Sequence, residues 1–269
     1  MVKEEYGLIG KTLGHSFSAK YFNEKFEREE IPARYDLYPL SNIDLLPDLI
    51  KEHTLLKGLN VTIPYKVEVL KYLDELSEEA RGIGAVNVIK ISRDKETGKT
   101  FLKGFNSDAY GFTESMKDVL KKSGYFEDCD KDENPLALVL GTGGASKAVV
   151  WSMHNLGFDT QLIGRKHRED CLAYDELTPQ VVNSAKVVVN CTPLGTSPDV
   201  NKAAPFPYEY LHEGQICFDL VYNPAKTLFM KICKAHGCIV SNGLEMLRLQ
   251  AVGAWKIWND NSTFASENR

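Results

Sequence analysis

The sequence of 269 residues has no long apolar run, no CxxC pair and no long basic run. Its uninterrupted apolar stretches, such as residues 136–140, are far too short to span a bilayer. The acidic start MVKEEYG is unlike the basic start of a signal peptide. We therefore expect a cytoplasmic protein without a membrane segment.

The cysteine pattern also argues against a metal site. The chain has six cysteines, and the only close pair, Cys233 and Cys238, has no neighbouring set of metal ligands. We expect reduced, mostly structural thiols and no metal. The remaining cysteines are Cys129, Cys171, Cys191 and Cys217.

The charge balance is mildly acidic, with 32 lysines and arginines against 37 aspartates and glutamates. This balance argues against a broad footprint on a nucleic-acid backbone, which needs a basic surface. A hydrophobic content of 43% and a charged content of 26% are ordinary for a globular protein. The length is sufficient for two domains.

Short apolar strands alternate with amphipathic helical stretches along the chain, which predicts an α/β protein with mostly parallel sheets. The acidic segment 124–135 predicts a surface loop before a second series of strands. A helix from Leu244 carries a wide apolar stripe that must be buried. We expect strands at 6–10, 33–37, 58–63, 86–91, 100–105, 136–140, 159–163, 187–190, 216–220 and 238–240.

The stretch GLNVTIPYK, residues 58–66, alternates apolar and polar residues as a half-buried strand does. Pro64 ends the ladder of hydrogen bonds, because proline has no N–H to donate. Asn60, Thr62 and Lys66 therefore come close together at the end of a strand.

The stretch LALVLGTGGASKAVV places Gly141, Gly143 and Gly144 between a strand and a helix. Glycines there allow a tight turn and a close approach to a pyrophosphate, whose charge the helix start attracts. The spacing GxGGxxxA departs from GxGxxG, but its context predicts a dinucleotide site that includes Ala145. The later stretch VVVNCTPLGT predicts a ligand loop at Thr192, at the carboxyl end of another strand.

The strand that follows the glycine-rich turn ends in Gly164, where NAD-binding folds commonly have an acidic residue. Arg165, Lys166, His167 and Arg168 come next. Guanidinium and ammonium groups suit a 2′-phosphate, so this run favours NADP over NAD. A basic surface loop is the alternative interpretation.

Two further polar clusters precede helices. Ser16 and Ser18 follow His15, while Asn106 and Asp108 lie within GFNSDAYGF. Helix capping explains serine and aspartate at such positions, and His15 fits a packed histidine better than a base.

Taken together and in order, these segments resemble the shikimate dehydrogenase family over essentially the whole chain. The matching motifs are GHSFS (14–18), GLNVTIPYK (58–66), GAVNV (84–88), GFNSD (104–108), GTGGASKA (141–148), NCTPLGT (190–196), DLVYNP (219–224) and GLEMLRLQ (243–250). The resemblance implies reversible, NADPH-dependent reduction of 3-dehydroshikimate to shikimate in aromatic amino-acid biosynthesis.

The resemblance also implies roles for individual residues. Lys66 and Asp108 would be the catalytic pair. A hydride that arrives at a carbonyl carbon leaves charge on oxygen, and an ammonium group supplies both a proton and a positive partner. The substrate would contact Ser16, Ser18, Thr62, Asn87, Tyr222 and Gln250. The cofactor would contact Gly141, Gly143, Gly144, Ala145, Arg165, Lys166, Thr192, Gly243 and Met246.

The order of the motifs implies an N-terminal α/β substrate-binding domain over 1–108, completed by 243–269, and a Rossmann-like NADP-binding domain over 109–242. The last helix would return to the first domain. We expect a monomer or homodimer that acts on a small molecule and binds neither nucleic acid nor membrane.

The chain departs from the family pattern at a few positions, and none removes a proposed catalytic group. These positions are Ala19 (usually proline), Val88 and Ser107 (threonine), Gly164 (asparagine) and Thr196 (methionine). Three alternatives stay open: a quinate/shikimate dehydrogenase that uses NAD or NADP, a non-catalytic nucleotide-binding regulator of the same fold, and a folate dehydrogenase. The paired serines suit a small carboxylate and disfavour the last of these.

Overall fold

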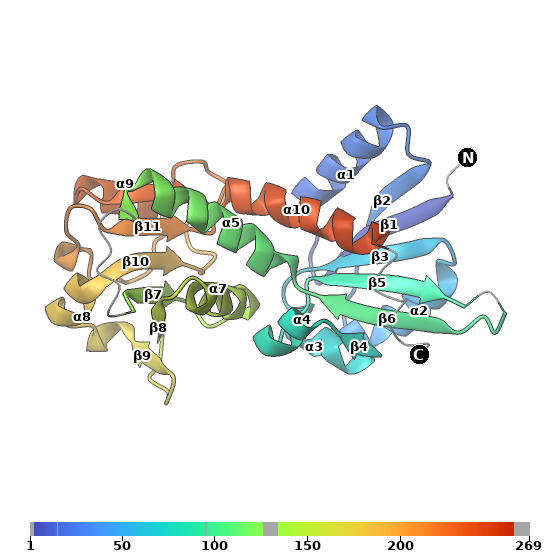
Figure 1. Cartoon of the computed structure of the whole chain (residues 1–269), viewed down its shortest axis with the longest axis horizontal. Helices are drawn as coiled ribbons and strands as arrows, with labels where there is room; N and C mark the ends of the chain where they lie inside the picture. The colour runs from blue at the N-terminus through green and yellow to red at the C-terminus, as the bar shows by residue number, and fades with distance from the viewer. Residues whose placement is uncertain (1–2, 15, 95, 126–133, 261–269) are drawn as a thin grey trace. The chain divides into compact units, whose positions relative to one another are not determined.

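The computed structural model describes residues 3–14, 16–94, 96–125 and 134–260. Its internal contacts divide the chain into two compact units (Figure 1). The first unit is Met1–Ser107 with Ala251–Arg269, and the second is Asp108–Gln250. His15, Cys129 and most of the predicted loop 124–135 lie outside the described residues.

The described part of the first unit contains a six-stranded mixed sheet in the order β2-β1-β3-β5-β6-β4. Strands β1, β2 and β3 are parallel, whereas β5 runs antiparallel to both β3 and β6. The strands are β1 (Glu4–Gly10), β2 (Ala33–Pro39), β3 (Leu56–Val61), β4 (Glu75–Leu76), β5 (Val88–Arg93) and β6 (Thr100–Phe105). The helices are α1 (Phe17–Arg28), η1 (Ile43–Leu45), α2 (Leu46–Glu52), α3 (Tyr65–Glu68), η2 (Val69–Tyr72) and α4 (Glu78–Ile83).

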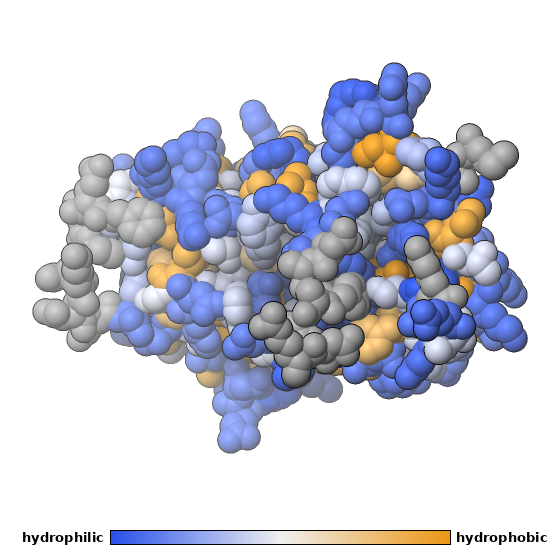
Figure 2. All heavy atoms as spheres, turned by 45° about the vertical axis from the view of Figure 1, so that its right-hand side comes forward, coloured by the Kyte–Doolittle hydropathy of each residue, from blue (hydrophilic) through white to orange (hydrophobic). Residues whose placement is uncertain are grey.

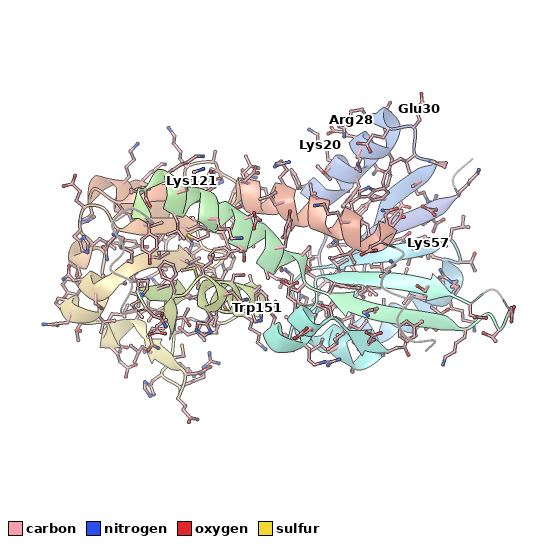
Figure 3. The ribbon with its side chains drawn as sticks, viewed as in Figure 1. Lys20, Arg28, Glu30, Lys57, Lys121 and Trp151 are labelled. Atoms are coloured by element: carbon pink, nitrogen blue, oxygen red, sulfur yellow. The ribbon has the colours of Figure 1, made fainter. Side chains whose placement is uncertain are left out.

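Both faces of the first sheet are covered. Helix α1 buries Phe22 and Phe26 on one face, while its polar side chains Lys20 and Arg28 point outward (Figure 3). The opposite face packs on α2, α3 and α4 through a second apolar cluster. Because strands alternate their side chains, one sheet supplies residues to both clusters.

The second unit is a parallel sheet in the order β12-β11-β10-β7-β8-β9, counted over its described residues. Its strands are β7 (Leu136–Leu140), β8 (Asp159–Gly164), β9 (Cys171–Ala173), β10 (Ala185–Asn190), β11 (Ile216–Asp219) and β12 (Ile239–Asn242). Its helices are α5 (Ser107–Lys122), α7 (Gly144–Asn155), η3 (Tyr174–Glu176), α8 (Pro179–Ser184), η4 (Tyr208–Tyr210), α9 (Leu228–Ala235) and α10 (Leu244–Asn259).

The strand order of the second unit is that of a doubly wound dinucleotide-binding fold. The chain goes outward from β7 to β8 and β9, then returns to the other side of β7 for β10, β11 and β12. The order therefore reverses between β7 and β10, which is where ligands bind in open α/β sheets. Helices α5 and α7 pack on one face and α8 and α9 on the other, so the central strands β7, β10 and β11 are mostly apolar.

The last helix, α10, has residues in the cores of both units. Met246 belongs to an apolar cluster of the second unit. Ala251, Ala254 and Trp258 belong to the apolar cluster of the first unit that contains Phe22 and Phe26 of α1. Trp258 Nε1 donates a hydrogen bond to the carbonyl of Ile89 at 3.1 Å. The apolar stripe expected on this helix is therefore buried.

The predicted α/β class is confirmed, with three differences in detail. The first sheet is mixed, because the tight connection between β5 and β6 forces an antiparallel pair. Strand β3 ends at Val61 and not at Ile63, because the chain turns into α3 at Pro64. The short strands β4 and β9 were not expected from the sequence, since two or three residues carry no periodic signal.

The domain boundaries expected from the sequence and the contact units overlap but are not the same. Residues 243–250 were expected with the first domain, but their contacts lie in the second unit. The division into a substrate domain and a cofactor domain stays a prediction.

The face of the molecule in Figure 2 is mainly hydrophilic, with hydrophobic side chains in small separate patches. Within the ranges that the structure describes, no helix combines the length and the apolar character needed to cross a bilayer.

Candidate active site

The segment from β3 to α3 fixes Thr62 and Lys66 by backbone hydrogen bonds. Thr62 N–H donates to the carbonyl of Ile9 at 2.9 Å, which ties it to the carboxyl end of β1. Val86, the residue before Asn87, donates its N–H to the carbonyl of Lys66 at 2.8 Å. Both side chains are half-buried, so each is held at a defined place and still reaches solvent.

Ser16 and Ser18 lie at the start of α1. Ser16 is the helix cap, and its Oγ accepts a hydrogen bond from Ala19 N–H at 3.3 Å. Ser18 lies in the first turn of the same helix. Both serines are half-buried, which leaves their hydroxyls within reach of a ligand.

Asn87 is buried, and its side chain forms hydrogen bonds with Ser107, the residue before Asp108. Its Oδ1 accepts from Ser107 N–H at 2.7 Å, and its Nδ2 donates to Ser107 Oγ at 3.1 Å. Asn106 Nδ2 donates to the carbonyl of Ala85 at 2.9 Å. These bonds fix the backbone where α5 begins, and Asp108, which is 3% exposed, follows in its first turn.

The proposed catalytic pair is divided between the two units. Lys66 belongs to the first unit and Asp108 to the second. Their pairing therefore stays a prediction.

A hydrogen-bonded polar chain joins several site residues of the first unit. Tyr35 Oη donates to Asn60 Oδ1 at 2.8 Å, and Asn60 Nδ2 donates to the carbonyl of Asn87 at 3.3 Å. With the contacts between Asn87 and Ser107, this polar chain passes from β2 through β3 to the start of α5. Tyr35 was missed from the sequence, because a tyrosine in a strand has no pattern that separates it from the core.

The glycine-rich turn of the second unit follows β7 at the reversal of strand order. Gly141 has φ +111°, which disfavours any side chain, and Gly143 caps the twelve-residue helix α7. A Cβ on Gly143 would meet no atom within 4 Å, so the glycine there leaves open space. The first N–H groups of α7 have no partner within the helix, and together with its dipole they favour an anion. Gly144 and Ala145 open this helix.

The packing at the end of β8 disfavours the carboxylate that a NAD-binding fold commonly has there. A Cβ on Gly164 would lie 2.9 Å from Cys171 Sγ and 3.2 Å from Thr142 Cγ2, which is closer than ordinary packing allows. An acidic side chain at this position would therefore require Cys171 and Thr142 to shift.

The basic run after β8 divides into paired and unpaired residues. His167 Nδ1 lies 3.0 Å from Glu176 Oε2, and Arg168 Nε lies 4.0 Å from Asp170 Oδ1. Arg165 and Lys166 are exposed, and neither forms an ion pair with any other described residue. The two cations nearest Gly164 are thus available to a phosphate.

Thr192 is held by a buried polar network after β10. Its N–H and Oγ1 both donate to Asn190 Oδ1, at 3.1 and 2.7 Å, and Asn190 Nδ2 donates to Asp219 Oδ1 at 2.9 Å. Asp219 also accepts from Thr227 Oγ1 at 2.5 Å. Burial raises the pKa of Asp219, although these hydrogen bonds oppose the rise. A Cβ on Gly141 would lie 3.4 Å from Thr192 Cγ2, so the loops after β7 and β10 are neighbours.

Four remaining predicted residues come after β11: Tyr222 in the loop that follows it, Gly243 directly before α10, and Met246 and Gln250 within α10. Tyr222 is 37% exposed, and partial burial raises its pKa. Packing alone explains the glycine at position 243, since a Cβ there would lie 2.1 Å from the carbonyl oxygen of Leu220. Met246 is buried in the core of the second unit, and Gln250 is half-buried. Ligand contacts of these four residues stay predictions.

No group of three or more histidine, cysteine or acidic side chains among the described residues is arranged to hold a metal. Five of the cysteines are described, and all five are free thiols.

The comparisons with known proteins agree with the motifs. The model of the shikimate dehydrogenase substrate binding domain matches residues 8–89. A curated shikimate dehydrogenase (NADP(+)) of Clostridium beijerinckii is 37% identical over 266 residues, covering 96% of this chain and 92% of that protein.

Solved structures give the same result. A chorismate mutase/shikimate 5-dehydrogenase fusion protein of Clostridium acetobutylicum is 35% identical, with a TM-score of 0.77 over 97% of this chain and 92% of that one. Shikimate 5-dehydrogenase of Thermus thermophilus, in complex with NADP(H) and shikimate, is 30% identical, with a TM-score of 0.76 over 95% of this chain and 93% of that one. Since the similarity extends over nearly the whole chain, this protein belongs to the shikimate dehydrogenase family.

Proposed function

We propose that this protein is an NADP-dependent shikimate dehydrogenase that reversibly reduces 3-dehydroshikimate to shikimate in aromatic amino-acid biosynthesis. The observation that carries the proposal is the 37% identity to the Clostridium beijerinckii shikimate dehydrogenase over 96% of the chain. The catalytic lysine and aspartate that the family implies are both present, as Lys66 and Asp108.

The residues of the second unit fit NADP. The start of α7 suits a pyrophosphate, with Gly141, Gly143, Gly144 and Ala145 in its turn. Arg165 and Lys166 suit a 2′-phosphate, because they are exposed cations without a carboxylate partner among the described residues. Thr192, Gly243 and Met246 complete the proposed cofactor site. The cofactor, when bound, supplies or accepts the hydride.

The residues of the first unit fit a small hydroxylated ring acid. The hydroxyls of Ser16 and Ser18 would hold the carboxylate, and Thr62 and Asn87 would contact the ring hydroxyls. Tyr222 and Gln250 would add further contacts. Asn87 is already oriented by Ser107, so little ordering is required when the substrate binds.

Lys66 would be the proton donor to the carbonyl oxygen of 3-dehydroshikimate. Its ammonium stabilises the charge that develops on this oxygen and transfers a proton to it, which leaves shikimate. Asp108 would orient Lys66 and accept a hydrogen bond from a ring hydroxyl. In the oxidative direction, neutral Lys66 would take the proton from the same oxygen.

A steady-state assay of the purified protein tests the proposal. NADPH absorbance is followed with 3-dehydroshikimate, and the reverse reaction is followed with shikimate and with quinate, each with NADP and with NAD. We expect turnover of shikimate with NADP to exceed the other combinations. No turnover of any combination would favour the non-catalytic regulator, and equal rates with quinate would favour the quinate/shikimate dehydrogenase. A cytoplasmic location and a monomeric or homodimeric state stay predictions.

A further inference from the structure

Tyr35 is a buried residue held from three sides within the first unit. It is 2% exposed, and its ring stacks on Phe22 with centroids 5.0 Å apart. Its backbone N–H donates to Asn23 Oδ1 at 3.0 Å, and its carbonyl accepts from Asn23 Nδ2 at 2.9 Å. The Tyr35 hydroxyl therefore has a fixed place between α1 and β3.

The direction of each hydrogen bond around Tyr35 follows from chemistry. The carbonyl of Asn87 can only accept, so the amide nitrogen of Asn60 must face it. The amide oxygen of Asn60 then faces Tyr35, and the phenol hydroxyl must donate its single hydrogen to this oxygen.

This order has a consequence for Asn60. Asn60 is half-buried, and its amide nitrogen carries a second hydrogen that a ligand oxygen can accept. If the amide rotated by half a turn, an acceptor would take the place of this donor.

We propose that Tyr35 is a positioning residue for the substrate, which fixes Asn60 as a hydrogen-bond donor. Tyr35 would act only through Asn60 and would not touch the substrate. The inference rests on the proposed function, because it assumes that a hydroxylated ring acid binds at the first unit.

The test compares Tyr35→Phe with the wild type. The substitution keeps the ring and its stacking on Phe22, but it removes the hydroxyl that holds Asn60. We expect the KM for shikimate to rise about tenfold, which is the loss of roughly one hydrogen bond, while the KM for NADP stays unchanged. Asn60→Ala should raise the KM for shikimate in the same way, and adding Tyr35→Phe to it should change this KM by less than about twofold.

The matched control is Tyr38→Phe, on the same strand. The Tyr38 hydroxyl is buried and has no hydrogen-bond partner among the residues that the structure describes, so its removal should leave both KM values unchanged. If Tyr35→Phe lowered the melting temperature but left the KM for shikimate unchanged, Tyr35 would be a stability residue only and the inference would fall. Additive effects of Tyr35→Phe and Asn60→Ala would also overturn it. A wild type without activity on shikimate would overturn the proposed function and this inference together.

Discussion

The two units build their parts of the proposed site by different means. In the first unit, polar side chains are bound to one another, as in the contacts of Tyr35 with Asn60 and of Asn87 with Ser107. In the second unit, the main features are missing side chains and a helix start, at Gly141, Gly143 and Gly164.

This difference matches the two ligands that we propose. A ring acid with several hydroxyls is recognised by donors and acceptors of defined direction, so each side chain must be oriented by a neighbour. A pyrophosphate carries diffuse charge that backbone N–H groups and a helix dipole can bind, provided that no Cβ blocks the approach. Substitutions in the first unit should therefore affect the substrate, and substitutions in the second unit should affect the cofactor.

The largest effect is expected for Lys66→Ala in the first unit. Loss of the proton donor should lower kcat by about 10²–10⁴-fold, while the Kd for NADP stays within about twofold. Steady-state kinetics and a fluorescence titration of NADP measure the two quantities. Lys57→Ala is the control, because Lys57 is an exposed lysine on β3 (Figure 3). A variant with normal turnover would remove Lys66 from the mechanism.

The next largest effect is expected for Arg165→Ala in the second unit. Loss of a charged donor to a 2′-phosphate should raise the KM for NADP by about 10–100-fold, with little change for NAD or shikimate. Arg168→Ala is the matched control, since Arg168 lies beside Asp170. If the KM for NAD rose as much as the KM for NADP, Arg165 would not contact the 2′-phosphate.

Gly143→Ala separates folding from cofactor binding. The new Cβ has open space, so the melting temperature should stay unchanged, but the KM for NADP should rise about fivefold if a pyrophosphate approaches there. Gly141→Ala is the contrasting variant. Its φ of +111° should lower the free energy of unfolding by roughly 1–3 kcal/mol. If Gly143→Ala left cofactor binding unchanged, the glycine would serve only the turn.

The smallest effect is expected for Asp44→Asn, at the surface of the first unit. Hydrogen bonds from Lys71 and Tyr72 lower the pKa of Asp44 to about 2. A lowered pKa stabilises the fold above the usual pKa of an aspartate, and this contribution is lost as the pH falls through about 2. The variant should melt slightly below the wild type at neutral pH, and the difference should disappear near pH 2. The kinetic constants for substrate and cofactor should not change, because Asp44, Lys71 and Tyr72 are not residues of the proposed site.

Local features of the sequence predicted much of the fold. Strand β7 has the predicted bounds, because a short apolar run before a glycine-rich turn leaves no other choice. Pro64 was expected to end a strand, and the chain does turn there. The strand order of the first sheet was not predictable, because pairs such as β1 with β3 and β3 with β5 join segments far apart in the chain, which leave no local pattern.

The candidate site shows the same limit. The motifs named Thr62, Asn87 and Asp108 without any structure, but the resemblance alone gave them roles. Tyr35 and Asp219 were not found, because what distinguishes them is a partner 25 or 29 residues away, Asn60 or Asn190. A sequence gives the donors and acceptors, but it does not say which of them meet.

The sequence by itself determined the α/β class, the order of the motifs and the glycines that the turn after β7 requires, because these depend on the conformations that neighbouring residues allow. Only the tertiary structure decided that Tyr35 holds Asn60 and that Arg165 has no carboxylate partner among the described residues, because these facts depend on which side chains folding brings together.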